Sequence, residues 1–413
     1  MDWISKGRYH YWAGGSFVVL AVFGVLLRLM HVTFVPHLNY IFLLHAHSHF
    51  AFAGWAFLGL AMLLAGRVSP VQRRRKFLYA LNATLVSAYG MLVSFSFQGY
   101  KTVSIIFSTF FILSTYYFTL QFLKSLKETR QLSKGARQLA LGALFFLCFS
   151  SLGPLALGPL MVMGLKGTAV YQDAIYVYLH FQLNGWMQLA AIALVEITYF
   201  NMCPTNPQRW VYQLLIWSNL PLYLIFTLWS NPAGWVFLIA GIAAAGNLTA
   251  WFMICRGRKT RLLKLPLLLK VAFLAITLKT VFQTLVCIPV IGRWAFSDRN
   301  IIIGYIHLLT LGIVTPIILD QFKQAGFFGA GKKLQIINGS YIVLTFAYLV
   351  ILFVEPALKL VGIIVQDVEP QLLLLSILLL LCGVGYFGLL ILGSSKKARQ
   401  VACKIRFKYL FLD

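Results

Sequence analysis

The chain has 413 residues, of which 60% are hydrophobic and only 11% are charged, and its mean hydropathy is +0.82. This composition excludes a soluble globular protein and is typical of a chain that lies in a lipid bilayer. The formal net charge is +25, and the six cysteines form no Cys-x-x-Cys pair, which argues against a zinc ribbon and against covalent haem attachment.

Apolar runs long enough to cross a bilayer, about 20 residues each, recur along the whole chain. They predict an all-α membrane protein with twelve membrane helices. The expected helices lie at residues 11–32, 40–66, 77–97, 102–123, 138–163, 174–199, 209–228, 233–254, 266–290, 300–321, 335–356 and 370–394. Residues 1–395 then form one membrane domain, and residues 396–413 form a basic tail along the inner membrane surface.

Basic residues fall in alternate connections between these helices. One side of the membrane receives the N-terminus and the clusters within residues 67–76, 124–137, 256–264, 323–333 and 396–408, whereas the other side has isolated basic residues. By the positive-inside rule, both termini and the tail are cytoplasmic. The charge therefore orients the helices and contacts anionic lipid headgroups, and we expect no nucleic-acid partner.

The second predicted helix contains the most unusual stretch, His45-Ala46-His47-Ser48-His49. Histidine is costly to bury in a membrane unless it binds something. A histidine followed five residues later by a glycine recurs in the sixth and tenth helices, at intervals of roughly 130 residues, which predicts three pseudo-repeats of four helices, about residues 1–137, 138–264 and 265–395. The pairs are His49 and Gly54, His180 and Gly185, and His307 and Gly312. For these glycines, tight helix packing and room for a flat cofactor are both open.

Helical geometry divides the histidines of the second helix between two faces. His45 and His49 are four residues apart and share a face, whereas His47 points about 200 degrees away. The second, sixth and tenth helices all enter the membrane from the outer side, so we expect His49, His180 and His307 to lie at one depth near that side. Neutral imidazole is the commonest ligand of haem and transition metals, which makes these residues candidate ligands.

These features resemble subunit I of the haem-copper oxidase superfamily, which has twelve spans and histidines on its second, sixth and tenth helices. The resemblance covers nearly the whole chain. It implies a haem held by His49, or by one of its neighbours such as His45, together with His307, and copper at His180. From the residues alone, His47 is a further candidate metal ligand. The NnrS-like haem- and copper-containing membrane proteins of the nitric oxide response are similar around His307-Leu308-Leu309-Thr310-Leu311-Gly312.

The chain departs from the oxidase pattern at the positions where that family reduces oxygen. Asn184 stands where the family has a tyrosine, and residues 209–228 contain no histidine where the family has two adjacent copper ligands. Tyr305 and Leu309 flank His307, where a second histidine is expected. A complete haem-copper centre is therefore not expected.

The resemblance implies a haem-binding redox protein of a bacterial-type inner (plasma) membrane, with a bis-histidine haem near the outer face. It would act in respiratory-type electron transfer, or bind or reduce a diatomic gas (O2 or NO), as an oxidoreductase if it is an enzyme. The implied partners are an electron donor, such as a cytochrome c or a quinol, and additional subunits. The alternative is a polytopic transporter of a metal ion or small molecule along a histidine-lined path.

Several charged residues are candidates for supporting roles. Lys279 lies deep in the ninth helix, and Glu196 and Asp320 lie near the cytoplasmic ends of the sixth and tenth helices. They are candidates for a proton path, although interface capping also explains the two carboxylates. Near the outer face, Arg28, Arg293 and Arg299 can pair with haem propionates, or with lipid headgroups.

Overall fold

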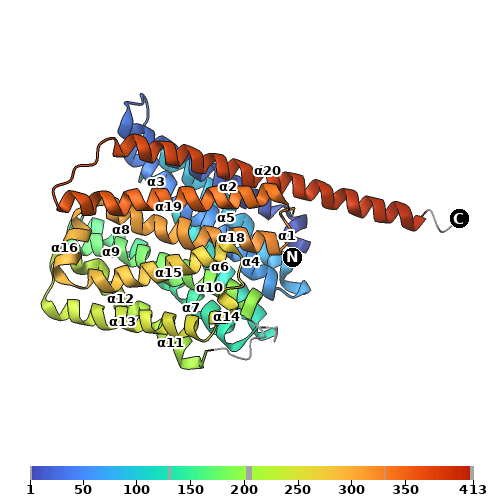
Figure 1. Ribbon diagram of the computed structural model, residues 1–413, viewed down its shortest axis with the longest axis horizontal. Helices are drawn as coiled ribbons and strands as arrows, with labels where there is room; N and C mark the ends of the chain where they lie inside the picture. Colours follow the sequence, from blue (N-terminus) through green and yellow to red (C-terminus); the bar gives the residue numbers. More distant parts are fainter. Residues whose placement is uncertain (1, 129–131, 201–206, 330, 410–413) are drawn as a thin grey trace.

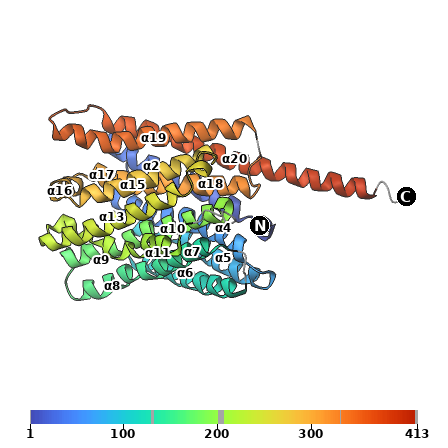
Figure 2. The same ribbon diagram turned by 60° about the horizontal axis from the view of Figure 1, so that its bottom comes forward.

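The computed structural model describes residues 2–128, 132–200, 207–329 and 331–409, and of the side chains in 394–409 nothing is described. The described chain is 87% helical and contains no strand. Eleven helices in this part of the chain are long and apolar enough to cross a membrane. They lie side by side in one bundle (Figures 1 and 2). In lipid, only helices and closed barrels satisfy every backbone polar group, so the composition and the fold agree.

The eleven helices coincide with eleven of the twelve predicted segments. They are Tyr9–Val32 (α2), Tyr40–Val68, Val71–Gln98, Thr102–Glu128 (α6), Lys134–Val162, Arg209–Ser230, Gly234–Arg256 (α13), Leu267–Val286 (α15), Arg299–Gln324, Lys332–Leu360 (α19) and Val368–Gly393. The remaining predicted segment, 174–199, falls in an unbroken helical run over residues 169–200 that is outside this set. A multi-pass membrane fold is therefore established, while the count of twelve stays a prediction.

Several of these spans combine more than one helix. They contain α3 (Tyr40–Phe50), η1 (Ala51–Phe57) and α4 (Leu58–Val68); η2 (Val71–Arg73) and α5 (Arg74–Gln98); α7 (Lys134–Ser150) and α8 (Leu152–Val162); α11 (Arg209–Trp217), α12 (Asn219–Leu222) and η5 (Tyr223–Ser230); and α17 (Arg299–His307), η6 (Leu308–Val314) and α18 (Thr315–Gln324). The run over 169–200 contains α9 (Ala169–His180), η3 (Phe181–Met187), α10 (Gln188–Val195) and η4 (Glu196–Phe200). Short helices α1 (Asp2–Lys6), α14 (Lys259–Leu262) and α16 (Pro289–Ser297) lie between or before the spans, and α20 (Val368–Tyr409) continues beyond the last one.

The three histidine-bearing helices share a local irregularity. A π-helical segment begins one or two residues after His49, His180 and His307, and each segment contains the repeated glycine. A π-helical turn inserts an extra residue, and such turns are frequent at functional sites. The matched π-segments add a structural regularity to the sequence pattern, although the three-unit build itself stays a prediction.

The same three helices meet at the centre of the bundle. Helix α10 contacts both α4 and α18, and η3 contacts η6. Close approach is possible because Gly59 faces Ile318, where an added Cβ would lie 2.8 Å from a methyl carbon of that side chain. A hydrogen bond of 2.8 Å from the Trp55 indole to the Thr315 hydroxyl links α18 to η1. The histidine helices therefore form the interior, and the other spans surround them.

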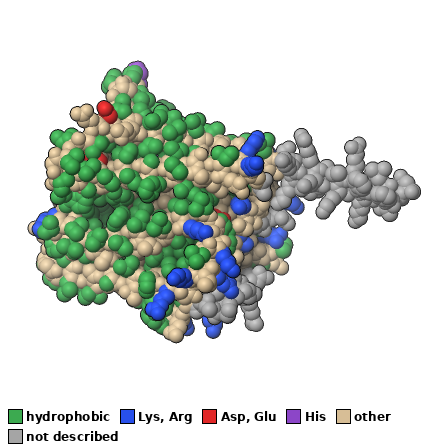
Figure 3. Space-filling view, viewed as in Figure 1, with side chains coloured by type: hydrophobic (Ala, Val, Ile, Leu, Met, Phe, Trp, Pro, Cys, Tyr) green, Lys and Arg blue, Asp and Glu red, His purple; other side chains and the backbone are tan. Residues whose placement is uncertain are grey.

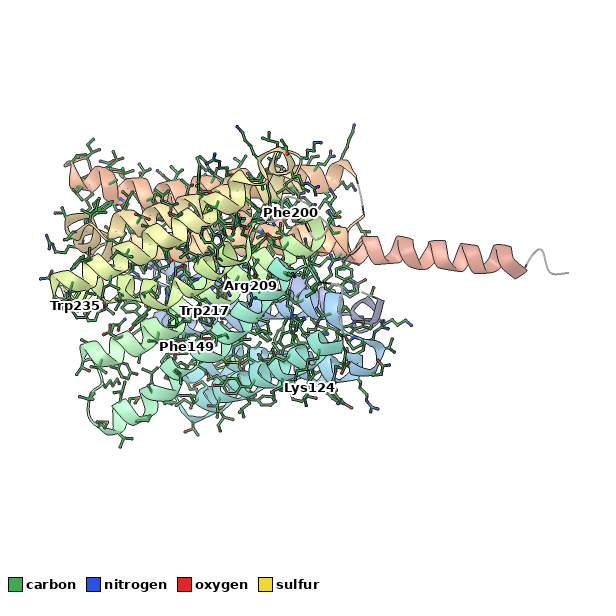
Figure 4. The ribbon with its side chains drawn as sticks, turned by 90° about the horizontal axis from the view of Figure 1, so that it is seen from below. Lys124, Phe149, Phe200, Arg209, Trp217 and Trp235 are labelled. Carbon is green, nitrogen blue, oxygen red and sulfur yellow. The ribbon has the colours of Figure 1, made fainter. Side chains whose placement is uncertain are left out.

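The surface of the bundle has the character of a lipid-facing protein. Large aliphatic and aromatic side chains are exposed along the outer spans as well as buried within (Figure 3). Helices that are apolar on all sides belong in a membrane. Lysine and arginine side chains gather at the end near the N-terminus (Figure 3), and Lys124 lies at that end whereas Trp235 lies at the opposite one (Figure 4). Basic residues therefore gather at one end of the bundle, as the sequence predicts. That this end is cytoplasmic stays a prediction.

Candidate functional site

His45 and His49 lie on the face of α3 that packs against α5. The His49 ring stacks on Phe95, with ring centroids 4.4 Å apart, and its Nε2 is 2.6 Å from the hydroxyl oxygen of Tyr100. His45 meets the same tyrosine edge-on, with centroids 4.6 Å apart. The predicted shared face is therefore observed, and both residues point towards α5 and the turn after it.

His47 lies on the other face of α3 and points towards α2. Its Cε1 atom is 3.4 Å from the position that a Cβ on Gly24 would occupy. Its ring lies near the Leu20 backbone and within electrostatic range of His307. Its Nδ1 is buried and has no hydrogen-bond partner among the described residues. His47, rather than His49, is thus the α3 histidine that lies against α2 and within electrostatic range of His307.

His307 ends α17 and is held in one orientation. Its Nδ1 is 2.8 Å from the carbonyl oxygen of Ile303, and because a carbonyl only accepts, Nδ1 carries the proton and Nε2 keeps its lone pair. Its ring lies 5.4 Å from that of Tyr348 between centroids. As whole residues, His47 and His307 are partly exposed, as is His49. A hydrogen bond from the second ring nitrogen to a carbonyl is the usual support of a metal-bound histidine.

Arg28 lies beside this pair of histidines. It interacts electrostatically with His307 and donates hydrogen bonds of 3.1 and 3.0 Å to the Tyr348 hydroxyl. It also pairs with Glu369 at 3.1 Å. Of the other two predicted arginines, Arg299 donates a hydrogen bond to the Tyr40 hydroxyl, and Arg293 is exposed on α16. One cation of the three therefore stands next to a candidate ligand.

His47 and His307 are two described residues that could hold a haem. They provide two imidazoles from different helices, each with one ring nitrogen outside the protein's own hydrogen bonds, and a neighbouring guanidinium that suits a propionate. Gly24 leaves the α2 side of the His47 ring free of a side chain, since an added Cβ there would lie 3.4 Å from Cε1. The sequence predicts that His49 and His307 hold one haem. In the structure, the ring of His49 contacts α5 and Tyr100 instead.

His180 is fully buried, and both of its ring nitrogens are engaged. Its Nε2 donates to the carbonyl oxygen of Asn219 at 2.8 Å, and its Nδ1 accepts from the Asn184 amide at 3.3 Å. A copper ion at His180 would have to displace one of these bonds. Within the described ranges, no group of three or more His, Cys, Asp or Glu side chains is placed to hold a metal ion.

The three candidates for a proton path lie in different surroundings. Lys279 is fully buried, and its Nζ has no hydrogen-bond partner in the described part of the chain. Asp320 accepts hydrogen bonds from Tyr199 at 2.8 Å and from Gln321 at 3.4 Å. Glu196 is bound by Arg258 through both guanidinium nitrogens, which ties the end of α10 to the segment after α13.

A tyrosine hydroxyl also takes part in the buried ion pair between Glu196 and Arg258. Tyr212 shares it through a hydrogen bond of 2.6 Å from Arg258. Burial alone lowers the pKa of the Arg258 guanidinium, but its bonds to Glu196 and Tyr212 raise that pKa above its ordinary value, so Arg258 is charged. Glu196 therefore acts as the partner of a fixed cation, which is the behaviour of a structural ion pair.

The repeated glycines are positions of close packing. An added Cβ would lie 2.7 Å from the Phe50 ring at Gly54, 2.4 Å from the Phe146 Cβ at Gly185 and 3.2 Å from the Ala275 Cβ at Gly312. Of the two explanations left open by the sequence, tight packing between helices accounts for Gly185 and Gly312, whereas the close neighbour of Gly54 is Phe50 of the same span.

Sequence reasoning missed the polar partners of the histidines. Asn219, Gln283, Tyr348 and Glu369 each bind a residue of the candidate site or of its network, yet none stands in a motif. Gln283 and Asn219 could have been noticed in the sequence, because each is a polar residue inside an apolar span. That pattern does not identify the residue to which either one binds. The sequence matches no protein-family model and none of the curated proteins.

Proposed function

We propose that the chain is a membrane-embedded, haem-binding redox protein in which His47 and His307 hold one haem. The observation that supports this most directly is the pair itself. His47 of α3 and His307 of α17 lie within electrostatic range of one another, and each has a ring nitrogen with no hydrogen-bond partner among the described residues. His180, by contrast, hydrogen-bonds through both ring nitrogens.

The surrounding residues have defined tasks in this proposal. Ile303 fixes the proton on Nδ1 of His307, which turns Nε2 towards a ligand and strengthens it as a base. Arg28 provides positive charge next to His307, where anionic propionates would be stabilised, and Tyr348 holds the Arg28 guanidinium in place. The bound haem would supply an iron that accepts and releases one electron.

Electron transfer is the activity that this arrangement favours. If His47 and His307 both held the haem, a gas such as O2 or NO would have to compete with one of these two residues. Asn184 and Asn219 also occupy both nitrogens of His180, which leaves a copper ion without a ready ligand there. We place the protein in a bacterial-type inner membrane, with twelve spans in three units and both termini cytoplasmic, where a cytochrome c or a quinol would be the electron donor.

The reduced-minus-oxidised absorption spectrum tests the proposal. Protein purified from haem-replete cells should show the Soret and alpha bands of a six-coordinate haem. His47→Ala and His307→Ala should each abolish these bands or convert them to a five-coordinate form. His49→Ala is the matched control from the opposite face of α3 and should leave the spectrum unchanged. Absence of both bands and of copurifying iron in the wild type would refute the proposal.

A further inference from the structure

A half-open pocket of about 380 Å³ lies between α6 and α7, two helices that contact each other. Figure 2 shows α6 along the lower edge of the bundle, and Figure 4 shows Lys124 of α6 at the end where basic residues gather. The volume lies within the range of ligand pockets in proteins, about 300–1,000 Å³. Four leucines and three basic residues line the pocket, and the basic ones are Lys124, Lys127 and Arg137.

The three basic side chains of this pocket are exposed, and the described protein supplies no counter-charge to them. None of Lys124, Lys127 and Arg137 forms an ion pair with a described residue. No described Asp or Glu lines the pocket, and Glu128, the residue after Lys127, is bound by Arg73 instead. Three cations that line one pocket repel one another, so an anion that enters between them is stabilised.

In both helices, leucines of the pocket lie on the membrane side of the cations. Leu120 precedes Lys124 by four residues as α6 approaches the basic end of the bundle, and Leu141 follows Arg137 by four residues as α7 leaves it. Four residues of helix span about 6 Å, so each wall changes from charged to apolar within about one turn. Leu120 and Leu123 are 54% and 37% exposed, which leaves this apolar wall open to a ligand.

A phospholipid has the same order of charge and apolar surface as this pocket. Its phosphate lies at the membrane surface and its acyl chains point towards the middle of the bilayer, whereas a free anion would leave the leucine wall without a partner. Basic pockets between membrane helices bind anionic lipid headgroups. The cluster Lys259, Arg261 and Lys264, in and after α14, has the same charge but lies outside this pocket. Charge alone therefore attracts anionic lipid to several places, and the pocket adds a defined site.

We propose that the pocket between α6 and α7 binds one anionic phospholipid. Its phosphate lies among Lys124, Lys127 and Arg137, and an acyl chain lies along Leu120 and Leu141. The site involves neither of the two candidate haem ligands, so it stands or falls independently of the haem.

Titration with matched lipids tests the proposal. Native mass spectrometry measures the affinity of the detergent-solubilised full chain for the first molecule of dioleoyl phosphatidylglycerol or dioleoyl phosphatidylcholine, which differ in headgroup charge. Wild type should bind the phosphatidylglycerol about tenfold more tightly, because several cations near a lipid phosphate each add affinity. Equal affinity for the two lipids overturns the proposal. Excess inorganic phosphate should displace no more lipid than chloride of equal ionic strength, and selective displacement by phosphate would show a site for a free anion and overturn it too.

A pair of triple variants separates this site from the general effect of positive charge. The pocket variant, Lys124→Gln/Lys127→Gln/Arg137→Gln, should lower the affinity for phosphatidylglycerol about tenfold. The control also loses two lysines and one arginine, all exposed, and should keep most of the affinity; it is Lys259→Gln/Arg261→Gln/Lys264→Gln. An equal loss in both variants means that the lipid responds to net charge alone and overturns the proposal.

Lysine acetylation in the wild type locates the lipid without any substitution. Phosphatidylglycerol should slow acetylation of Lys124 and Lys127, measured by peptide mass spectrometry, more than that of Lys259 and Lys264. All four lysines are exposed and therefore open to the reagent. Equal protection of the two pairs, or protection of Lys259 and Lys264 alone, contradicts a site between α6 and α7. This measurement decides the question even if the pocket variant fails to fold.

Discussion

Replacing Arg258 with methionine tests whether Glu196 is fixed in a structural ion pair or is available to carry protons. Glu196 and Arg258 are each 1% exposed, and Arg258 binds both carboxylate oxygens as well as the Tyr212 hydroxyl. Removing one partner of a buried pair leaves an uncompensated charge and costs about 3–5 kcal/mol. Arg258→Met should therefore lower the free energy of unfolding by about that amount.

The free energy of unfolding can be measured by denaturant titration in detergent for wild type, Arg258→Met, Glu196→Gln and the double variant. The double variant should be less destabilised than the sum of the two single variants, because no unpaired charge is left behind. Arg73→Met is the control, since its partner Glu128 is exposed and such surface pairs contribute little. If Arg258→Met costs no more than this control, the ion pair is not structural and the reasoning is wrong.

Three further predictions concern the candidate haem site and the packing around it. Arg28→Gln should lower the midpoint potential of the haem, because a positive charge near the iron favours the reduced state, as a redox titration would show. Gly24→Leu should reduce the haem content of the purified protein, because a side chain there meets the His47 ring. Gly185→Val should lower the apparent Tm, because its Cβ would lie 2.4 Å from that of Phe146.

Matched substitutions control these three predictions. Arg293→Gln changes an exposed arginine and should leave the potential unchanged, so an equal shift would refute the role of Arg28. Gly388→Leu and Gly158→Val are controls for the two glycines, since an added Cβ at either position meets no atom of a described residue within 4 Å. Full haem content in Gly24→Leu, or a Tm for Gly185→Val equal to that of Gly158→Val, would contradict the packing argument.

The division of the histidines in α3 was predictable, whereas their partners were not. His45 and His49 share one face and His47 lies on another because each residue turns a helix by about 100 degrees, which is a local property. Which face meets α2 and which meets α5 depends on how the helices pack. Since membrane helices are apolar on all sides, their hydrophobic pattern does not reveal the inward face.

Buried polar groups illustrate the same limit. Lys279 stands out in the sequence because a charge inside an apolar span is costly, and the structure confirms that it is fully buried. Gln283, one helical turn later, lines an apolar cavity and belongs to the network of His180, yet an uncharged amide gives a weaker signal. The sequence makes Glu196 a candidate for a proton path or for interface capping, but its partner Arg258 lies 62 residues away in the chain.

The sequence by itself determined that the chain is a multi-pass helical membrane protein, and it located eleven of the described spans, because hydropathy acts within each segment. Only the tertiary structure decided that His47 rather than His49 lies within electrostatic range of His307, that both nitrogens of His180 are occupied, and that an apolar cavity forms beside Gln283. These features depend on contacts between distant segments. Such contacts are fixed by the packing of whole helices and leave no local pattern in the sequence.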